Sequence, residues 1–347
     1  MQSRFLQLQK WLKQIFNHYE GEICPLAKDA SFRRYYRIFV EGISYIVMDA
    51  PLAYERPDVF YHLAKTLKSY GLRVPNCYAY QKSQGFLVLD DFGDTQLFHL
   101  ADTKKNTAFY DKALAILTQF WKINTRIFPS YPDKKIDDEM DLMPEWFLPF
   151  IGREISGEAT YVQTYTRLKA LLLENIHLQP KVFVHLDFHS KNIMYDNGHY
   201  GIIDFQDAVK GPISYDLVSI LRDCYVTLPD AFIKTKLNEY RQTAIKMKCI
   251  DEETSLTTWQ KWFDWTGLQR HLKCLGIFTR QSLKNGRDDY LVYLPRVTAY
   301  IDKVLENYSE FRDFRDLWKT HLKPACDQKL ATLPIFHHSL IHDTLPR

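Results

Sequence analysis

The stretch FVHLDFHSKNIMYDNGHYGIID, residues 183–204, constrains this chain more than any other part of its sequence. An apolar strand-like run leads into a loop that carries Asp187, and Asn192 follows five residues later. The turn signal DNG then separates two further strand-like runs, and Asp204 follows the second of them. Because a tight hairpin returns the chain beside itself, this order predicts that Asn192 and Asp204 lie side by side.

These oxygen-bearing side chains suit the transfer of a phosphoryl group to an alcohol, which depends mainly on positioning and on neutralising charge. Asp187 is the candidate base, which accepts or orients the proton of the attacking hydroxyl. Asn192 and Asp204 are candidate ligands of Mg²⁺, a cation that prefers oxygen donors. Taken singly, each residue is as well explained as a turn or cap residue. We interpret His185 as structural, and a zinc site is disfavoured because no third nitrogen or sulfur ligand recurs nearby.

Length and composition set the class of protein. A chain of 347 residues is longer than a single hydrophobic core usually organises, so two lobes are expected. The net charge of +3, with no long basic run, argues against nucleic-acid binding. The six cysteines show no metal or disulfide spacing, which favours a reducing cytoplasm. No window is long enough to span a membrane, and we expect the amphipathic N-terminal segment to pack on the protein itself. We expect a monomer.

Element patterns change along the chain. Residues 35–40 and 43–48 predict a hairpin, residues 55–70 a helix and residues 86–89 a strand. A hinge is expected near residues 90–93, where DDFG follows that strand. The polar, proline-marked residues 128–141 are interpreted as a surface loop or lid. The predicted fold class is α+β and bilobal, with a β-rich N-terminal lobe over residues 1–91 and a mainly helical C-terminal lobe over residues 92–347. Helical patterns are found at residues 107–123, 142–178, 214–248, 255–285 and 289–306.

Several motifs resemble those of the aminoglycoside phosphotransferase and choline kinase superfamily, small-molecule relatives of the protein kinases. HLDFHSKNIM resembles their H-x-D-x-x-x-x-N catalytic loop, and IIDFQDA resembles their metal-binding segment. GPISYDLVSILRDCY resembles a helix in which Asp216 would be structural and would bond the backbone of the catalytic loop. The resemblance spans roughly residues 20–310 and implies a protein-kinase-like fold, with ATP and Mg²⁺ as cofactors.

A narrower resemblance is to the anomeric sugar kinases of bacterial cell-wall recycling, carried above all by IDFQDAVKGPISYDL and LQRHLKCLGIF. That group phosphorylates the C1 hydroxyl of N-acetylmuramate and N-acetylglucosamine, so the resemblance implies a small-molecule amino-sugar substrate and a sugar 1-phosphate product. The acceptor should face Asp187. The polar residues nominated for it from family-like segments are Glu145, Arg153, Asp207, Gln269 and Arg270.

The segments expected to bind the phosphates of the nucleotide depart from the sequence pattern of kinases. DASFRRYYRI has no glycine, so phosphate contacts are expected from backbone N–H groups around Ala30 to Arg33, which include Ser31 and Phe32, and from arginine side chains. YIVMDAP has no lysine where the third strand of a kinase supplies one. Our hypothesis is that Arg33, Arg34 or Arg37 replaces it, because a guanidinium can bind phosphate with two parallel hydrogen bonds.

The resemblance also places adenine at the backbone of the hinge, around Leu89 to Asp91. Two other functions remain open. One is a kinase for another small alcohol, such as an aminoglycoside, choline or homoserine. The other is a pseudokinase-like module that binds nucleotide without turnover, for which the missing lysine is the main support. A protein kinase is disfavoured because no A-P-E-like anchor follows Asp204.

Overall fold

The computed structural model describes residues 2–17, 19–26, 32–100 and 107–337, and within these ranges the chain forms two compact units. Unit 1 contains the residues up to Leu97 together with Asn192–Asp207, and unit 2 contains Phe98–Lys191 and the residues from Ala208 onward. The lobe boundary expected at residues 91 and 92 stays a prediction. The segment with Asn192 and Asp204 clusters with the N-terminal residues, whereas Asp187 belongs to unit 2.

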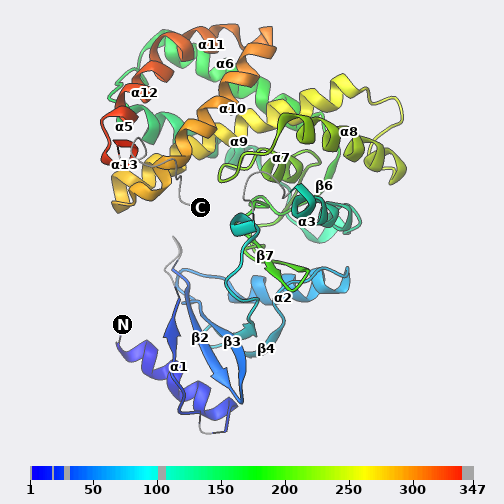
Figure 1. Cartoon of the computed structure of the whole chain (residues 1–347), viewed down its shortest axis with the longest axis vertical. Coiled ribbons are helices and arrows are strands. Elements are labelled where there is room, and N and C mark those ends of the chain that lie inside the picture. Colours follow the sequence, from blue (N-terminus) through cyan, green and yellow to red (C-terminus); the bar gives the residue numbers. More distant parts are fainter. Residues whose placement is uncertain (1, 18, 27–31, 101–106, 338–347) are drawn as a thin grey trace. The chain divides into compact units, whose positions relative to one another are not determined.

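Unit 1 is built on a five-stranded antiparallel sheet in the order β1-β2-β3-β5-β4 (Figure 1). The hairpin of β2 and β3 is confirmed, and its two turn residues Glu41 and Gly42 have positive φ, as a tight turn of this length requires. The strands and helices of this unit are β1 (Cys24–Pro25), β2 (Arg34–Val40), β3 (Ile43–Asp49), β4 (Cys77–Gln81), β5 (Phe86–Asp90), β7 (Ile193–Asp196), β8 (His199–Ile202), α1 (Gln2–Ile15) and α2 (Pro57–Ser69).

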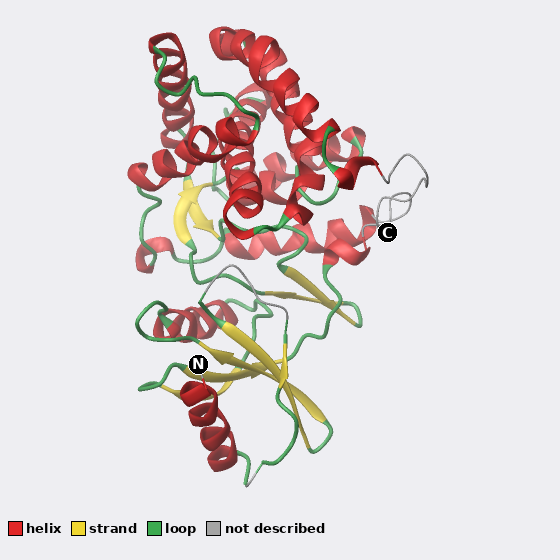
Figure 2. Cartoon of the chain, turned by 90° about the vertical axis from the view of Figure 1, so that its left-hand side faces the viewer, coloured by secondary structure: helices red, strands yellow, loops and turns green. Residues whose placement is uncertain are grey.

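The N-terminal helix packs on the protein, as expected. Leu8, Trp11 and Leu12 of α1 are buried against Ile38 and Val47 of the sheet, which places α1 along one sheet face (Figure 2). This interface hides the apolar stripe of the helix from water, which is the main source of stability for an amphipathic helix. A peripheral membrane role is not needed to explain the stripe, and no helix among the described residues has the length and hydropathy of a membrane span.

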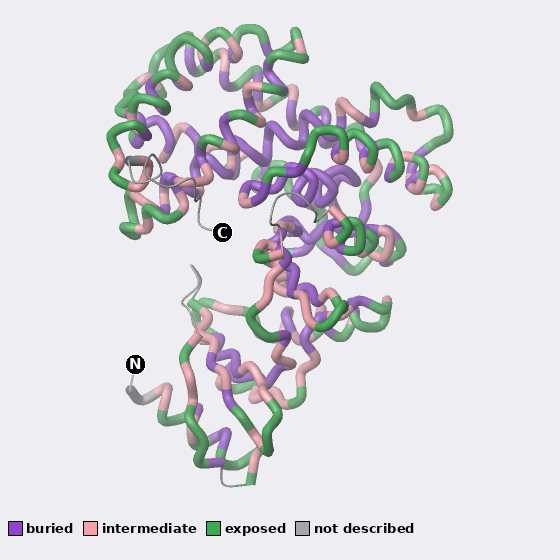
Figure 3. The backbone as a smooth tube through the Cα atoms, in the orientation of Figure 1, coloured by how far each residue is buried: buried purple, intermediate pink, exposed green. Residues whose placement is uncertain are grey.

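Unit 2 is helical and is organised around α9 (Leu256–Asn285), which packs against α4, α6, α7 and α10. This helix is buried along most of its length (Figure 3), as expected of one that is covered on several sides. Ser255 caps its N-terminus by accepting a hydrogen bond from the Thr258 N–H at 3.0 Å, and Gly286 ends it in the left-handed conformation.

The remaining helices are short or medium in length, and one antiparallel strand pair, β6 with β9, accompanies them. The elements of unit 2 besides α9 include α3 (Thr107–Phe120), the 3₁₀ turn η2 (Thr125–Ile127), α4 (Asp133–Leu142), the π-helical turn η3 (Met143–Phe147), α5 (Leu148–Phe150), α6 (Ala159–His177), β6 (Lys181–Val184), β9 (Val209–Pro212), α7 (Tyr215–Leu221), α8 (Asp230–Lys246), the 3₁₀ turn η4 (Asp288–Tyr293), α10 (Leu294–Asn307), the 3₁₀ turn η5 (Ser309–Phe311), α11 (Arg312–Leu317), the π-helical turn η6 (Trp318–Leu322), α12 (Lys323–Ala331) and α13 (Pro334–His337).

The interpretation of residues 128–141 as a loop or lid was wrong, because α4 occupies residues 133–142. Ile136, Met140 and Met143 recur every three or four residues and are buried, so they form an apolar stripe within an otherwise charged sequence. The long helical patterns at 142–178 and 214–248 are also each divided. The first is interrupted after α5, and the second consists of α7 and α8.

Candidate active site

The loop that carries Asp187 is fixed at its start by Asp216, as the resemblance implied. The His185 N–H donates to Asp216 Oδ2 at 2.6 Å and the Leu186 N–H donates to Oδ1 at 3.2 Å. Leu186 has a φ of +75°, an unfavourable conformation for a branched side chain that these two bonds help to hold. Burial raises the pKa of Asp216 to about 7, and the two backbone hydrogen bonds oppose that rise. Asp216 therefore shapes the backbone immediately before the candidate base.

The other residues around the loop strengthen this support. His185 is buried and its Nδ1 accepts the Asp187 N–H at 3.3 Å, which matches the structural role expected for it. At the far end of the loop, Asp223 accepts the N–H groups of Ser190 and Tyr225, both at 2.8 Å. Asp223 was not singled out from the sequence, although it follows Asp216 within the same motif. Two buried carboxylates thus hold the two ends of the loop.

Lys191, the last loop residue in unit 2, lies among aromatic rings. Its Nζ is 4.1 Å from the centroid of Tyr225, 4.7 Å from that of Tyr293 and 5.1 Å from that of Phe98, and it donates to the Tyr293 hydroxyl at 3.2 Å. Burial lowers the pKa of Lys191, while the charge of Asp223 opposes this shift. Contacts of a cation with several ring faces hold its side chain in one place. They anchor the chain directly before Asn192.

The electrostatic surroundings of Asp187 come largely from α9. Burial raises the pKa of Asp187, but the charge of Lys273 and smaller contributions from His189, His185 and Arg270 more than offset it, so the pKa lies below its ordinary value. Asp187 is therefore ionised at neutral pH, as a proton acceptor must be.

Lys273 is held by a carboxylate network that the sequence did not reveal. Its Nζ is 3.1 Å from Glu139 Oε1 of α4, and Glu139 Oε2 in turn accepts from the Tyr131 hydroxyl. The only sequence signal was that Lys273 follows Gln269 and Arg270 within LQRHLKCLGIF, one helical turn further on. An ion pair between residues that lie far apart in the sequence, such as Lys273 and Glu139, can be recognised only once the fold is known.

The residues nominated for acceptor binding fall into a buried set on α9 and an exposed set elsewhere. Arg270 is buried in α9, donates to Cys224 Sγ at 3.3 Å and acts electrostatically on Asp187. Gln269 is fully buried, and neither atom of its side-chain amide has a partner among the described residues. Glu145 and Asp207 are exposed, the former in η3 and the latter in unit 1, where it accepts from Gln206. Arg153 is exposed as well.

The candidate metal ligands flank the predicted hairpin of β7 and β8, Asn192 just before β7 and Asp204 two residues after β8. The Ile203 N–H donates to the Asn192 carbonyl at 3.1 Å, so the pairing of the two strands places Asn192 opposite the residue before Asp204. Asp204 has a φ of +65°, and its Oδ1 accepts from Gln206 Nε2 at 2.8 Å. An amide oxygen and a carboxylate are hard donors that suit Mg²⁺ better than zinc. The described residues contain no cluster of three or more His, Cys, Asp or Glu side chains that could hold a metal ion.

Unit 1 also contains the candidate phosphate-binding arginines. Ser31 lies outside the described residues. Phe32 is exposed and its ring stacks on Tyr54, with 4.3 Å between centroids. Arg33 Nε lies 3.2 Å from Glu55 Oε2, and Arg33 Nη1 lies 3.7 Å from Asp204 Oδ1. Arg34 begins β2 opposite Asp49, in the register of β2 and β3.

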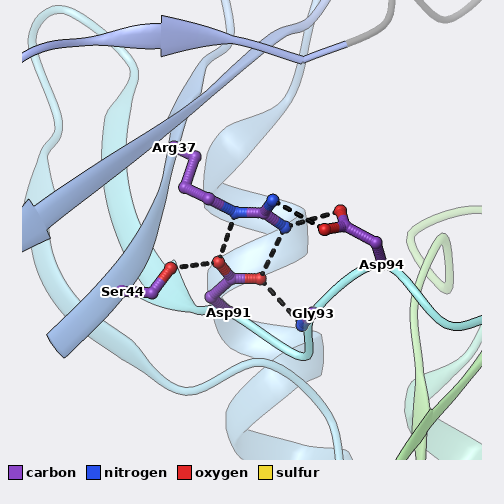
Figure 4. Close-up of polar contacts among 5 residues, drawn as sticks. All are labelled: Arg37, Ser44, Asp91, Gly93 and Asp94. Carbon is purple, nitrogen blue, oxygen red and sulfur yellow. Dashed lines mark hydrogen bonds and ion pairs between the residues drawn. The ribbon is translucent and has the colours of Figure 1, made fainter.

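Arg37 is committed to a different contact, which Figure 4 shows. Its Nε is 2.6 Å from Asp91 Oδ2 and its Nη2 is 2.8 Å from Asp94 Oδ1, so one guanidinium bridges two carboxylates. Asp91 also accepts from the Ser44 hydroxyl and from the Gly93 N–H. The hydrogen bonds that Arg37 donates to Asp94 and Asp91 raise its pKa against the effect of burial. Arg37 therefore braces the segment after β5, which makes it a poor candidate for phosphate binding.

The expected adenine region lies at the end of β5. Leu89 is buried and pairs with Ile46 of β3. Asp90 and Asp91 line a pocket of about 290 Å³ within unit 1, together with Arg73 and Phe92. The Arg37 brace and the left-handed Gly93 fix the backbone that follows.

These elements define a class of protein. The five-stranded antiparallel sheet, the hairpin with Asn192 and Asp204, and the helical unit with Asp187 form the mixed α+β fold of aminoglycoside phosphotransferases and choline kinases. The chain belongs to the phosphotransferase enzyme family, whose sequence pattern matches residues 22–250.

Two curated relatives are similar over almost the whole chain. The N-acetylmuramate/N-acetylglucosamine kinase of Pseudomonas putida is 32% identical over 327 residues, which cover 90% of this chain and 95% of that protein. The protein of the same description from Neisseria meningitidis is 34% identical over 321 residues, which cover 89% of this chain and 93% of that protein.

Solved structures agree with this fold at much lower identity. Choline kinase LicA from Streptococcus pneumoniae has a TM-score of 0.60 at 15% identity, covering 87% of this chain and 98% of that chain. Aminoglycoside phosphotransferase APH(4)-Ia, in a ternary complex with ADP and hygromycin B, has a TM-score of 0.54 at 16% identity, covering 85% and 98%. At such identities the likeness establishes the fold alone.

Proposed function

We propose that this phosphotransferase is an ATP-dependent kinase that phosphorylates the anomeric hydroxyl of N-acetylmuramate and N-acetylglucosamine. The observation that carries the proposal is the similarity, at 32–34% identity over about 90% of the chain, to two kinases described as acting on these sugars. The product would be a sugar 1-phosphate, and the reaction would serve the recycling of peptidoglycan sugars in the cytoplasm, where a single chain would suffice.

In this proposal Asp187 accepts the proton of the C1 hydroxyl as its oxygen forms a bond to the γ-phosphorus. The bond between that phosphorus and the β,γ-bridging oxygen breaks, and ADP leaves. Asn192 and Asp204 would hold Mg²⁺, which supplies charge neutralisation on the phosphates. Backbone groups around Leu89 to Asp91 would bond adenine. The low pKa of Asp187 supports its role, since the carboxylate needs no deprotonation before it can act.

The charges near Asp187 also bear on the choice among acceptors. Lys273 and Arg270 act on Asp187 from α9, and a cationic acceptor would be repelled by them. A neutral or acidic acceptor fits this environment better, which favours the N-acyl sugars over choline or an aminoglycoside. A nucleotide-binding module without turnover would have no need of a loop held at both ends by Asp216 and Asp223.

The test is a kinase assay followed by phosphorus and proton NMR. Either sugar incubated with ATP and Mg²⁺ should give an α-1-phosphate, and the matched methyl glycosides, whose C1 oxygen is blocked, should give none. Choline and hygromycin B serve as alternative acceptors. If neither sugar gains a phosphate at C1 while another alcohol is phosphorylated, the sugar assignment is wrong and the second class of kinase replaces it.

A further inference from the structure

The strand that provides a phosphate-binding lysine in related kinases has none here. β3 reads ISYIVMD, and the Asp49 that ends it is already paired with Arg4 at 2.6 Å. Transfer of a phosphoryl group still requires a cation on the phosphate chain, because negative charge accumulates on its oxygens. The question is which other cation of unit 1 lies beside the candidate metal ligands.

Arg33 is that cation. Its guanidinium lies 3.2 Å from Glu55 and 3.7 Å from Asp204, the candidate metal ligand. The side chain is only 11% exposed, while those of Glu55 and Asp204 are 16% and 32% exposed. Burial lowers the pKa of Arg33, but Tyr35, Asp204 and Glu55 together raise it, so the guanidinium stays charged.

Glu55 fixes this arginine in two ways. Its Oε2 pairs with the guanidinium, and its Oε1 accepts the Phe32 N–H at 3.2 Å, so that one carboxylate holds both the side chain and the backbone just before it. Glu55 itself lies two residues ahead of Pro57, where α2 begins. Because these contacts already restrict the conformation of Arg33, its side chain loses less conformational entropy when it binds a ligand.

The other two arginines are less suitable. Arg37 already bridges Asp91 and Asp94. Arg34 is the first residue of β2 and lies opposite Asp49 of β3 in the register of the sheet. Arg33 is the one of the three that lies beside Asp204.

We propose that Arg33 binds the phosphate chain of the nucleotide in place of the missing strand lysine, and that Glu55 is its positioning residue. The pair takes over the task of the kinase Lys–Glu pair from other positions, the residue just before β2 and the residues ahead of α2. Before nucleotide binds, Arg33 also offsets part of the charge of Asp204. This inference rests on the proposed function for its nucleotide and is independent of the identity of the acceptor.

Binding assays without any acceptor sugar test the proposal. Isothermal titration calorimetry with adenosine, ADP and ATP should show about 10- to 100-fold weaker binding of ADP and ATP to Arg33→Gln, and adenosine affinity within about twofold of the parent. Arg33→Lys should recover part of the loss, because it restores the charge but not the planar fork. Glu55→Gln should weaken the binding of ADP and ATP by a smaller factor and should likewise leave adenosine affinity unchanged.

Arg34→Gln is the matched control and should bind all three ligands like the parent. Unchanged ATP binding by Arg33→Gln, an equal loss for adenosine and ATP, or a loss confined to Arg34→Gln would each overturn the assignment. A parent protein that binds ADP and ATP no better than adenosine would overturn it as well. A parent that binds ATP but phosphorylates neither sugar would refute the acceptor in the proposed function and leave the Arg33 assignment standing.

Discussion

Replacing Asp216 by asparagine should loosen the start of the loop that carries Asp187, while the size of the side chain at position 216 hardly changes. The carboxylate is 3% exposed and accepts two backbone hydrogen bonds, from the N–H groups of His185 and Leu186. Asparagine retains one oxygen acceptor and turns an amide N–H₂ group toward the second donor. One buried N–H then lacks an acceptor, at a cost of about 1–3 kcal/mol.

A central cost of about 2 kcal/mol sets the size of two measurable effects. The unfolding temperature of a domain as large as unit 2 should be about 4–8 °C lower in the variant than in the parent. The amides of His185 and Leu186 should exchange with deuterium about 30-fold faster, since about 1.4 kcal/mol corresponds to a tenfold change. Both are best measured at pH 8, because the pKa of Asp216 is about 7 and the carboxylate is ionised there.

Asp223→Asn provides the control at the other end of the loop. Asp223 is equally buried and accepts two backbone bonds, but they come from Ser190 and Tyr225. Its variant should speed exchange at those two amides and leave the start of the loop protected. Unchanged exchange at Leu186 in Asp216→Asn, or the same exchange pattern in both variants, would refute the reasoning that each carboxylate holds its own end.

Three further outcomes are expected. Asp187→Asn should lower turnover about 10²–10⁴-fold and leave ATP affinity unchanged, so a parallel loss of both would contradict its role as base. Lys273→Met should raise the pKa of Asp187, because Lys273 is the strongest charge opposing the effect of burial, and should shift the acid limb of the pH–rate profile upward; an identical profile would count against this. Gly276→Ala should destabilise the fold by about 2 kcal/mol in urea titrations, since its Cβ would lie 2.3 Å from the Leu142 carbonyl, whereas Gly157→Ala, which has open space, should not.

The parts of the fold that sequence alone predicted depend on short-range signals. The two hairpins have turn residues that accept positive φ, and α9 has a serine cap and a terminal glycine. The structural role of Asp216 followed from a motif resemblance, and the hydrogen bonds to His185 and Leu186 confirm it. These features are encoded within a few residues of where they act.

The parts that were missed depend on contacts between distant residues. The pair of Lys273 with Glu139 joins positions 134 residues apart, and the Arg37 brace spans 54 residues to Asp91. β9 is a strand because it pairs with β6, and its own four residues, VKGP, carry no strand pattern. Helix α4 was missed for another reason, because prolines and charged residues around it obscured a short apolar stripe.

The chain passes from unit 2 to unit 1 between Lys191 and Asn192, so the candidate base and the candidate metal ligands belong to different units. Lys191 and Asn192 are adjacent in sequence, yet the first is anchored in unit 2 by aromatic rings and the second begins a hairpin that belongs to unit 1. Backbone bonds from Tyr195 to Thr95 at 2.7 Å and from Ile202 to Arg73 at 2.8 Å hold that hairpin in its unit.

On the proposed roles, the groups that handle the phosphoryl donor therefore share one compact unit, with Arg33 and Asp204 in direct contact. The base and the cations that tune it share the other, since Asp187 and α9 both belong to unit 2. A substitution on α9 can alter the acceptor without disturbing the contacts that hold the nucleotide.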